Sequence, residues 1–249
     1  IEISRHRQRL MVLTMVDLSD SLDRGAFPDR ILIIRLSAIG DVVFSSPLVD
    51  ALKGVYPGAD IFWLAESPVV PLLEHHPHLC DVIVWPRKEW SELLSSGRWL
   101  ALLKEIVRFK KRLRQYRFDL VIDAQGLLKS AVLAWMTGAV RRVGFASKEP
   151  TRALLTERIE KDAGPAISSE YRAMAKHLGC QNDVFPMKVC VPPAVEVWAD
   201  GFRGDAPYIA LCPFTTRPQK HWPEAHWQVL ARSLVSRGWR VVVLGGPAD

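Results

Sequence analysis

Asp41 stands where the sequence changes from a strand pattern to a helical pattern. The apolar run 31–34 is typical of a strand buried in a parallel sheet. The turn Ser37–Gly40 follows, and Gly40 can take backbone angles that other residues resist. We therefore expect Asp41 at the carboxyl end of a strand, where open α/β sheets bind their ligands. The alternative is that Asp41 only caps the helix, since aspartate is a favoured capping residue.

A second polar group lies in the run Asp123–Ser130, which also leaves a strand pattern and opens a helix. Gln125, Gly126 and Lys129 should therefore face the same edge of the sheet as Asp41. A ligand bound there would meet a carboxylate, an amide and a cation. The same pattern also fits a plain strand-to-helix turn with a solvated lysine.

A third group lies in the loop 213–224, between a later strand pattern and a helix. Thr215 and Thr216 offer hydroxyl and backbone N–H groups, and Lys220 offers a positive charge. The amino end of a helix with such neighbours is a natural phosphate site. A plain surface loop is the alternative.

The last strand pattern is followed by a glycine-rich turn, in which Gly245, Gly246 and Asp249 could lie against a nucleotide. The sequence has no Gly-x-Gly-x-x-Gly after its first strand pattern and no Gly-Lys-Ser/Thr loop. These absences argue against an NAD-dependent oxidoreductase and against a Walker-type site. His221 and His226 are not joined by suitable carboxylates, so we expect no metal site.

Alternating strand and helix patterns position these groups. Alternation of this kind predicts an α/β fold with a parallel sheet and right-handed crossovers. Pro192 and Pro193 interrupt the alternation, which then restarts, as is typical of a linker between domains. We expect an N-terminal extension, a first Rossmann-like domain, a linker and the start of a second domain at 1–29, 30–191, 192–206 and 207–249. Strands are expected at 31–35, 61–65, 81–85, 118–123, 141–145, 208–212 and 239–244, and helices between them, the first ending at about 55.

The composition narrows the class of protein. Hydrophobic residues make up 49% of the 249 residues and charged residues 24%, which is ordinary for a globular protein. No apolar run reaches the length of a transmembrane helix. The formal net charge of +6 suggests an acidic partner, either a nucleic acid, a nucleotide or an anionic membrane surface. The four cysteines form no Cys-x-x-Cys pair, which favours reduced thiols in a cytosolic chain.

Three motifs resemble the ADP-heptose:lipopolysaccharide heptosyltransferases of glycosyltransferase family 9. They are Arg35-Leu-Ser-Ala-Ile-Gly-Asp41, the run 118–130 with Asp-Ala-Gln-Gly-Leu-Leu-Lys-Ser, and Thr215-Thr-Arg-Pro-Gln-Lys-His-Trp-Pro223. The last two are most similar to members that add the first heptose to the Kdo-lipid A inner core. The resemblance covers about residues 30–249.

The resemblance implies a GT-B fold, in which two Rossmann-like domains face each other across a cleft. It implies an inverting transfer with Asp41 as the catalytic base, and it places the donor diphosphate on Thr215, Thr216 and Lys220. A carboxylate suits the first role because the acceptor hydroxyl must lose a proton as it attacks. Lys220 suits the second because the leaving group gains negative charge, so neither a cofactor nor a metal is strictly required. The family pattern also implies more of the second domain than these residues contain, including most adenine and ribose contacts.

The acceptor side follows from the same resemblance. Acceptor contacts are implied for Ser37, Gly40, Gln125, Gly126, Lys129 and Lys148. Lys148 stands where the family pattern has arginine, and lysine keeps the charge but loses the planar fork that binds carboxylates. The implied partners are ADP-heptose, Kdo-lipid A and an anionic inner-membrane surface.

The implied location is cytoplasmic and peripheral, on the inner face of the inner membrane. The basic stretch 108–117 could meet anionic lipid or the acidic acceptor there, although a solvated helix face would have the same composition. A nucleotide-binding or nucleic-acid-binding α/β module without transferase activity is the alternative function. We expect no nucleic acid partner, because the aromatic residues stand mostly in apolar runs rather than along a basic face.

Overall fold

The computed structural model describes residues 27–162, 164, 166, 168–181, 184–203, 207–215 and 218–246. The chain divides into two compact units, Ile1–Cys190 and Val191–Asp249, and each is described by itself. Most of the N-terminal extension expected at 1–29 lies outside the described residues.

The first unit contains a six-stranded sheet in which every neighbouring pair of strands is parallel. The strand order is β3-β2-β1-β4-β5-β6, so the direction of winding reverses between β1 and β4. Ligands of open α/β sheets bind at this switch point, outside the carboxyl ends of the strands. The parallel Rossmann-like sheet predicted from the sequence is therefore confirmed. The strands are β1 (Arg30–Ile34), β2 (Asp60–Ala65), β3 (Asp81–Val84), β4 (Leu120–Asp123), β5 (Arg141–Phe145) and β6 (Glu157–Ile159).

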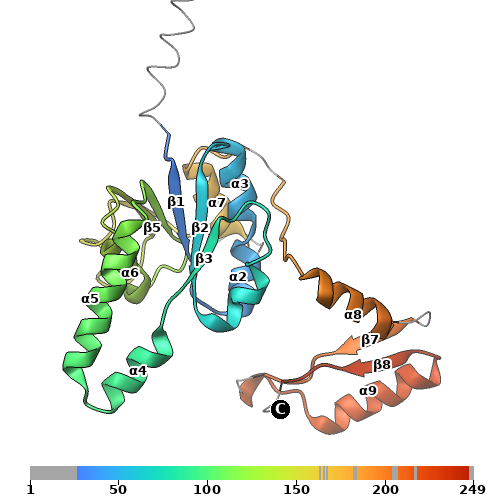
Figure 1. Ribbon diagram of the computed structural model, residues 1–249. Coiled ribbons are helices and arrows are strands. Elements are labelled where there is room, and N and C mark those ends of the chain that lie inside the picture. Colours follow the sequence, from blue (N-terminus) through green and yellow to red (C-terminus); the bar gives the residue numbers. More distant parts are fainter. Residues whose placement is uncertain are drawn as a thin grey trace, which may run out of the picture. The chain divides into compact units, whose positions relative to one another are not determined.

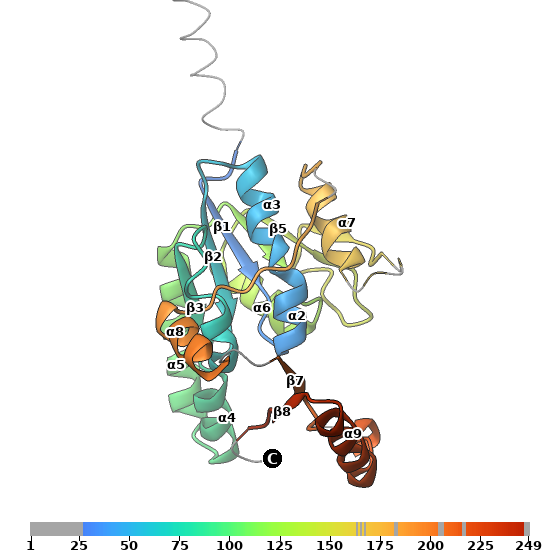
Figure 2. The ribbon, with the colours of Figure 1, turned by 90° about the vertical axis from the view of Figure 1, so that its right-hand side faces the viewer.

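Helices cover both faces of this sheet (Figures 1 and 2). Ile31 and Ile33 of β1 pack with α2 (Ile39–Ser45), α3 (Pro47–Val55) and α7 (Ser169–His177) on one face. Leu32 and Ile34 pack with α5 (Trp99–Gln115) and α6 (Leu128–Thr137) on the other. A strand buried on both faces needs a continuous apolar run, as β1 has. The remaining helical segments of this unit are η1 (Ser67–Leu72) and α4 (Arg87–Ser95), and α4 packs against α5.

Two features of the first unit differ from the sequence prediction. The single helix expected up to residue 55 is two helices, because Pro47 begins α3 and has no backbone N–H with which to continue α2. The short edge strand β6 was not predicted, since its sequence Glu-Arg-Ile has no apolar run. An edge strand pairs on one side only and can therefore be short and charged.

The second unit contains two parallel strands, β7 (Tyr208–Leu211) and β8 (Arg240–Val243), joined through α9 (Glu224–Ser236). It also contains α8 (Pro193–Arg203) and the short η2 (Pro218–Lys220). Helix α8 falls within 192–206, where we expected a linker. Its helical form has a local reason, because proline is favoured at a first helical position. The apolar residues Val195, Trp198 and Phe202 also recur at helical spacing.

Asp123 ends β4 and shapes the loop that follows it. The residue is fully buried, and its Oδ1 accepts hydrogen bonds from the backbone N–H groups of Gln125 (3.0 Å) and Gly126 (3.1 Å). Burial raises the pKa of this carboxyl, whereas the two N–H groups and the charge of Arg35 oppose the rise. The loop geometry therefore depends on an acceptor oxygen at this position more than on a negative charge.

Replacing Asp123 with asparagine tests this view. An asparagine keeps the acceptor oxygen, so we expect Asp123→Asn to be at least as stable as the parent at pH 7 in chemical denaturation. Because the folded-state pKa lies above the unfolded value of 3.8, the parent loses stability as the pH rises above that value. The advantage of the variant should therefore disappear near pH 4. Asp123→Ala removes the acceptor and should cost about 1–3 kcal/mol at either pH. A clear loss for Asp123→Asn at pH 7 alone would show instead that an ionised carboxylate supports the fold.

Candidate active site

A buried arginine holds Asp41 at the carboxyl end of β1. Arg35 directly follows β1 and is 7% exposed. Its Nη1 donates a hydrogen bond to the backbone carbonyl of Ala124 (3.0 Å), and its Nη2 forms an ion pair with Oδ2 of Asp41. The Asp41 side chain is 46% exposed, so one end of the pair is buried and the other faces solvent. This arrangement fixes a carboxylate at the switch point between β1 and β4.

Asp41 is the third residue of α2 and does not occupy the capping position. The residue at the N-cap is Ala38, whose backbone N–H lies 3.4 Å from Oδ2 of Asp41. An acid at the third position commonly reaches back to this N–H group. The ion pair with Arg35 is a second interaction that helix capping does not require. Capping alone therefore does not account for the environment of Asp41.

Gln125 and Gly126 shape the neighbouring loop after β4. The side-chain Oε1 of Gln125 accepts the backbone N–H of Leu36 at 2.8 Å, which ties the ends of β1 and β4 together. Gly126 has a φ of +70°, and a Cβ there would lie 3.1 Å from the Cβ of Phe145. A side chain at this position would be strained and crowded. Both residues lie at the edge predicted from the sequence, and the fold itself requires each of them.

The prediction for Gly40 was wrong in one respect. Gly40 lies inside α2, outside the left-handed region, and a Cβ there would meet only the ring of Phe44, at 3.8 Å. The helix begins at Ile39, two residues earlier than expected, so the turn precedes Gly40. Gly40 is exposed, and Ser37 is half-buried in the preceding turn. Their predicted acceptor contacts remain predictions.

A group of cations lies around Glu66, which directly follows β2. Arg87 donates from Nη1 to Oε2 of Glu66 at 3.0 Å, and Nζ of Lys129 lies 3.8 Å from Oε1 of the same residue. A pocket of about 370 Å³ adjoins them, and its lining also includes Ser67, Trp85 and Lys88. The sequence pattern points to Lys129 but not to Glu66 or Arg87, although each follows a predicted strand. Lys148 is exposed after β5.

The second unit carries the remaining predicted residues. Thr215 follows β7 and is half-buried, and its backbone carbonyl oxygen lies 2.7 Å from Nε2 of His221. Lys220 is exposed at the end of η2, and Gly245 and Gly246 are exposed after β8. Thr216 and Asp249 lie outside the described residues. The described part of the loop thus leaves a strand and leads to α9, as the phosphate-site prediction requires.

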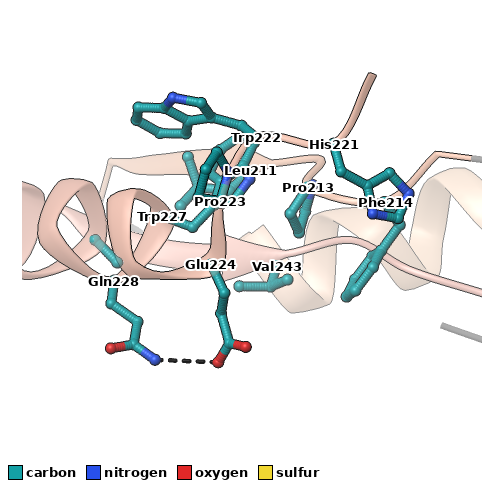
Figure 3. Close-up of a pocket in the computed structure, with 11 residues that line it drawn as sticks. Leu211, Pro213, Phe214, His221, Trp222, Pro223, Glu224, Trp227, Gln228 and Val243 are labelled. Atoms are coloured by element: carbon teal, nitrogen blue, oxygen red, sulfur yellow. Dashed lines mark hydrogen bonds between the residues drawn. The ribbon is translucent and has the colours of Figure 1, made fainter. Parts of the chain in front are cut away.

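A pocket of about 650 Å³ also opens in the second unit, beside this loop (Figure 3). Its lining includes Pro213, His221 and Trp222, and Trp222 packs edge-to-face on Trp227 at 5.0 Å. The lining contains one acid, Glu224, and no lysine or arginine. Such a surface suits an apolar contact, so we do not assign the diphosphate to it.

One cluster of the described residues has the composition of a metal site. Nδ1 of His78 lies 2.7 Å and Nε2 of His76 lies 3.6 Å from Oδ1 of Asp50. However, Nδ1 of His76 accepts the backbone N–H of His78 at 3.2 Å, so the ring proton of neutral His76 belongs on Nε2. Lys188 Nζ also lies 3.5 Å from Oδ2 of Asp50. Burial lowers the pKa of His76, which favours this neutral form. His78 is hydrogen-bonded to Asp50 and to His76, and a ring proton on Nε2 of His76 leaves that nitrogen no lone pair for a metal.

The geometry supports one kind of chemistry in the first unit. Asp41 offers a solvent-facing carboxylate, and Arg35 restricts where its oxygens can lie. A carboxylate fixed in this way can accept a proton from a hydroxyl group that binds within hydrogen-bonding distance. Basic residues at the same edge can hold an acidic ligand.

The chain is similar to known proteins over most of its length. The family model for glycosyltransferase family 9 (heptosyltransferase) matches residues 106–249. Lipopolysaccharide heptosyltransferase 1 of Pseudomonas aeruginosa is 34% identical over 231 residues, which are 88% of this chain and 61% of that protein. Lipopolysaccharide heptosyltransferase 1 of Escherichia coli K12 is 28% identical over 85% of this chain and 66% of that protein.

Solved structures show the same fold. E. coli heptosyltransferase WaaC with ADP matches with a TM-score of 0.64 and 26% identity, over 88% of this chain and 68% of that chain. E. coli ADP-heptose LPS heptosyltransferase II matches with a TM-score of 0.68 and 25% identity, over 88% and 65%. The chain thus spans about 61% of the length of the Pseudomonas relative. With a family model that covers more than half of its residues, the chain belongs to glycosyltransferase family 9, the heptosyltransferases.

Proposed function

We propose that the protein transfers heptose from ADP-heptose to the Kdo-lipid A inner core of lipopolysaccharide, with inversion at the anomeric carbon. Family membership supports the reaction class, and similarity to two lipopolysaccharide heptosyltransferases 1 supports the acceptor. The observation that carries the proposal is the half-exposed carboxylate of Asp41, held at the switch point of the sheet by buried Arg35.

Asp41 acts as the general base in this proposal. The acceptor hydroxyl donates its proton to the carboxylate while its oxygen attacks the anomeric carbon, and the bond to the ADP oxygen breaks. Arg35 is a positioning residue, because its guanidinium touches Asp41 and the carbonyl of Ala124. A fixed base reduces the cost of bringing the reacting groups together.

The donor diphosphate is assigned to the loop after β7. Lys220 and the backbone and hydroxyl groups of Thr215 and Thr216 would stabilise the negative charge that ADP gains as it leaves. Gly245, Gly246 and Asp249 are assigned to the nucleotide side. In this proposal these protein groups stabilise the negative charge of the leaving group, so no metal is required.

The acidic acceptor is assigned to the basic edge of the first unit. Lys129, Arg87 and Lys88 surround Glu66 and the pocket beside it, and they would meet the carboxylates of Kdo or the phosphates of lipid A. Ser37, Gly40, Gln125, Gly126 and Lys148 complete the proposed acceptor side. Because this acceptor is a lipid, the proposed location is the inner face of the inner membrane, with the protein peripheral to it.

The first test removes the base. In the intact enzyme we expect Asp41→Asn to lower kcat with ADP-heptose and Kdo-lipid A by roughly a hundredfold or more. Asparagine has a similar shape but cannot accept the proton, so the dissociation constant for ADP should change little. Near-normal turnover would remove Asp41 from the role of base.

Asp60→Asn serves as the matched control for that variant. Asp60 begins β2, at the opposite end of the strands from Asp41, and it is exposed. The kcat of the Asp60→Asn variant should equal that of the parent. If the parent bound ADP but transferred no heptose to any lipid acceptor, a nucleotide-binding module without transferase activity would be the better description.

The second test concerns the diphosphate. Lys220→Ala should lower kcat/KM for ADP-heptose by roughly tenfold or more, because the ammonium group supports both donor binding and departure of ADP. Arg232→Ala removes a cation from the exposed surface of α9 and should leave donor kinetics unchanged. Unchanged donor kinetics for Lys220→Ala would reject the diphosphate assignment.

A further inference from the structure

Helices α4 and α5 form a hairpin that extends past the carboxyl ends of β1, β2 and β3 (Figures 1 and 2). The two helices pack against each other, and Trp90 of α4 meets Phe109 of α5 edge-to-face at 5.7 Å. Helix α5 reaches the core through buried Phe109 and Leu113, and Ile106 packs against the same cluster. The first half of α5 therefore has a surface that the sheet does not cover.

That surface is apolar. Trp99 is 59% exposed, Leu100 85%, Leu103 58% and Val107 51%, and at about 100° per residue they form one stripe along α5. Leu94, at the end of α4 beside the turn of the hairpin, is also exposed. Exposed apolar residues gathered in this way on a protein surface commonly mark a site of interaction. We call Trp99, Leu100, Leu103 and Val107 the hairpin stripe.

Cations border the hairpin stripe. Lys104 and Lys111 are exposed and lie only about 40° and 20° around the helix from Leu100. Arg98 and Arg112 are also exposed on or next to α5. The acid on α5, Glu105, forms an ion pair with Arg108 at 2.6 Å and lies on the far side of the helix from the stripe. The surface thus combines apolar side chains with exposed lysine and arginine side chains.

We propose that the hairpin stripe docks on an anionic lipid surface. A helix that lies in a membrane interface has apolar residues on one side and lysine or arginine beside them, and tryptophan favours this depth. A second copy of the chain is a poorer occupant, since a two-fold interface would bring two sets of like charges together. Among the described residues, none of the helices could span a bilayer.

The position of the hairpin indicates how docking would help the reaction, an inference that rests on the proposed function. The hairpin projects from the edge of the sheet that carries Asp41 and Lys129 (Figure 1). Docking would bring that edge to the membrane, where the polar part of a lipid-anchored acceptor lies. The apolar side chains would enter the interface, and the lysines would meet lipid phosphates.

Vesicle flotation with the whole protein tests the proposal without any need for transferase activity. We expect binding to vesicles of phosphatidylcholine with phosphatidylglycerol, weaker binding to phosphatidylcholine alone, and release by added salt. Leu100→Ser with Leu103→Ser should lower the partition coefficient by about tenfold or more. Lys104→Gln with Lys111→Gln should reduce binding to the anionic vesicles only.

Two controls keep the test specific. Val140→Ser changes an apolar residue that is 87% exposed beside β5, outside the hairpin, and Arg158→Gln removes an exposed cation on β6. Both should bind vesicles like the parent. Equal binding by the hairpin variants would overturn the proposal, as would a change in oligomeric state by light scattering with no change in vesicle binding. Transfer to a short water-soluble acceptor should be the same in the hairpin variants as in the parent. If the parent itself transferred no heptose to that acceptor, the result would count against the proposed function and not against docking.

Discussion

The buried guanidinium of Arg35 is the interaction on which the candidate site depends. Burying a cation at the carboxyl ends of the strands costs free energy unless charged and polar partners surround it. Here one nitrogen meets Asp41, another meets the carbonyl of Ala124, and the ring of Tyr171 lies 6.0 Å from the guanidinium carbon. The same contacts that stabilise Arg35 therefore fix the start of α2 against the end of β4. The buried guanidinium needs a charged partner, and this need positions the solvent-facing carboxylate of Asp41.

Two carboxyl groups at this edge have different environments. Asp123 is fully buried, and burial raises its pKa, so its importance lies in accepting two backbone hydrogen bonds. Asp41 is half exposed and paired with an arginine. Of the two, Asp41 is the one that a ligand in solution can reach. Its surroundings thus favour Asp41 over Asp123 for proton transfer, and the fold explains why both acids are present.

The sequence predicted those parts of the fold that depend on one local pattern. Apolar runs located β1 to β5 because strands buried on both faces need them. It did not predict β6, whose place at the edge depends on pairing with β5 and not on its own residues. Pro192 and Pro193 predict a linker, because paired prolines are typical of a break, whereas Pro193 begins helix α8.

The site was predicted as far as strand ends allow. Asp41, Gln125 and Lys129 were found because each follows a strand in a parallel sheet. Arg35 was missed as a partner of Asp41, because an arginine at a strand end is ordinarily solvated, and only the packed structure shows it buried. Glu66 was missed because a single acid after a strand is uninformative until its two cations are placed beside it.

The connection from β3 to β4 links these observations. A crossover between parallel strands needs only one helix, yet this one contains both α4 and α5. The additional helix adds the half-buried ring of Trp90 to the core, and no residue of α4 is fully buried. It extends the protein at the carboxyl edge of the sheet, beside Arg87 and the loops that carry Asp41 and Lys129. A parallel sheet gathers its loops at one edge, so a projection from that edge can hold a flat partner near the candidate base. A hairpin of the same residues at the amino ends of the strands would hold such a partner far from the candidate base.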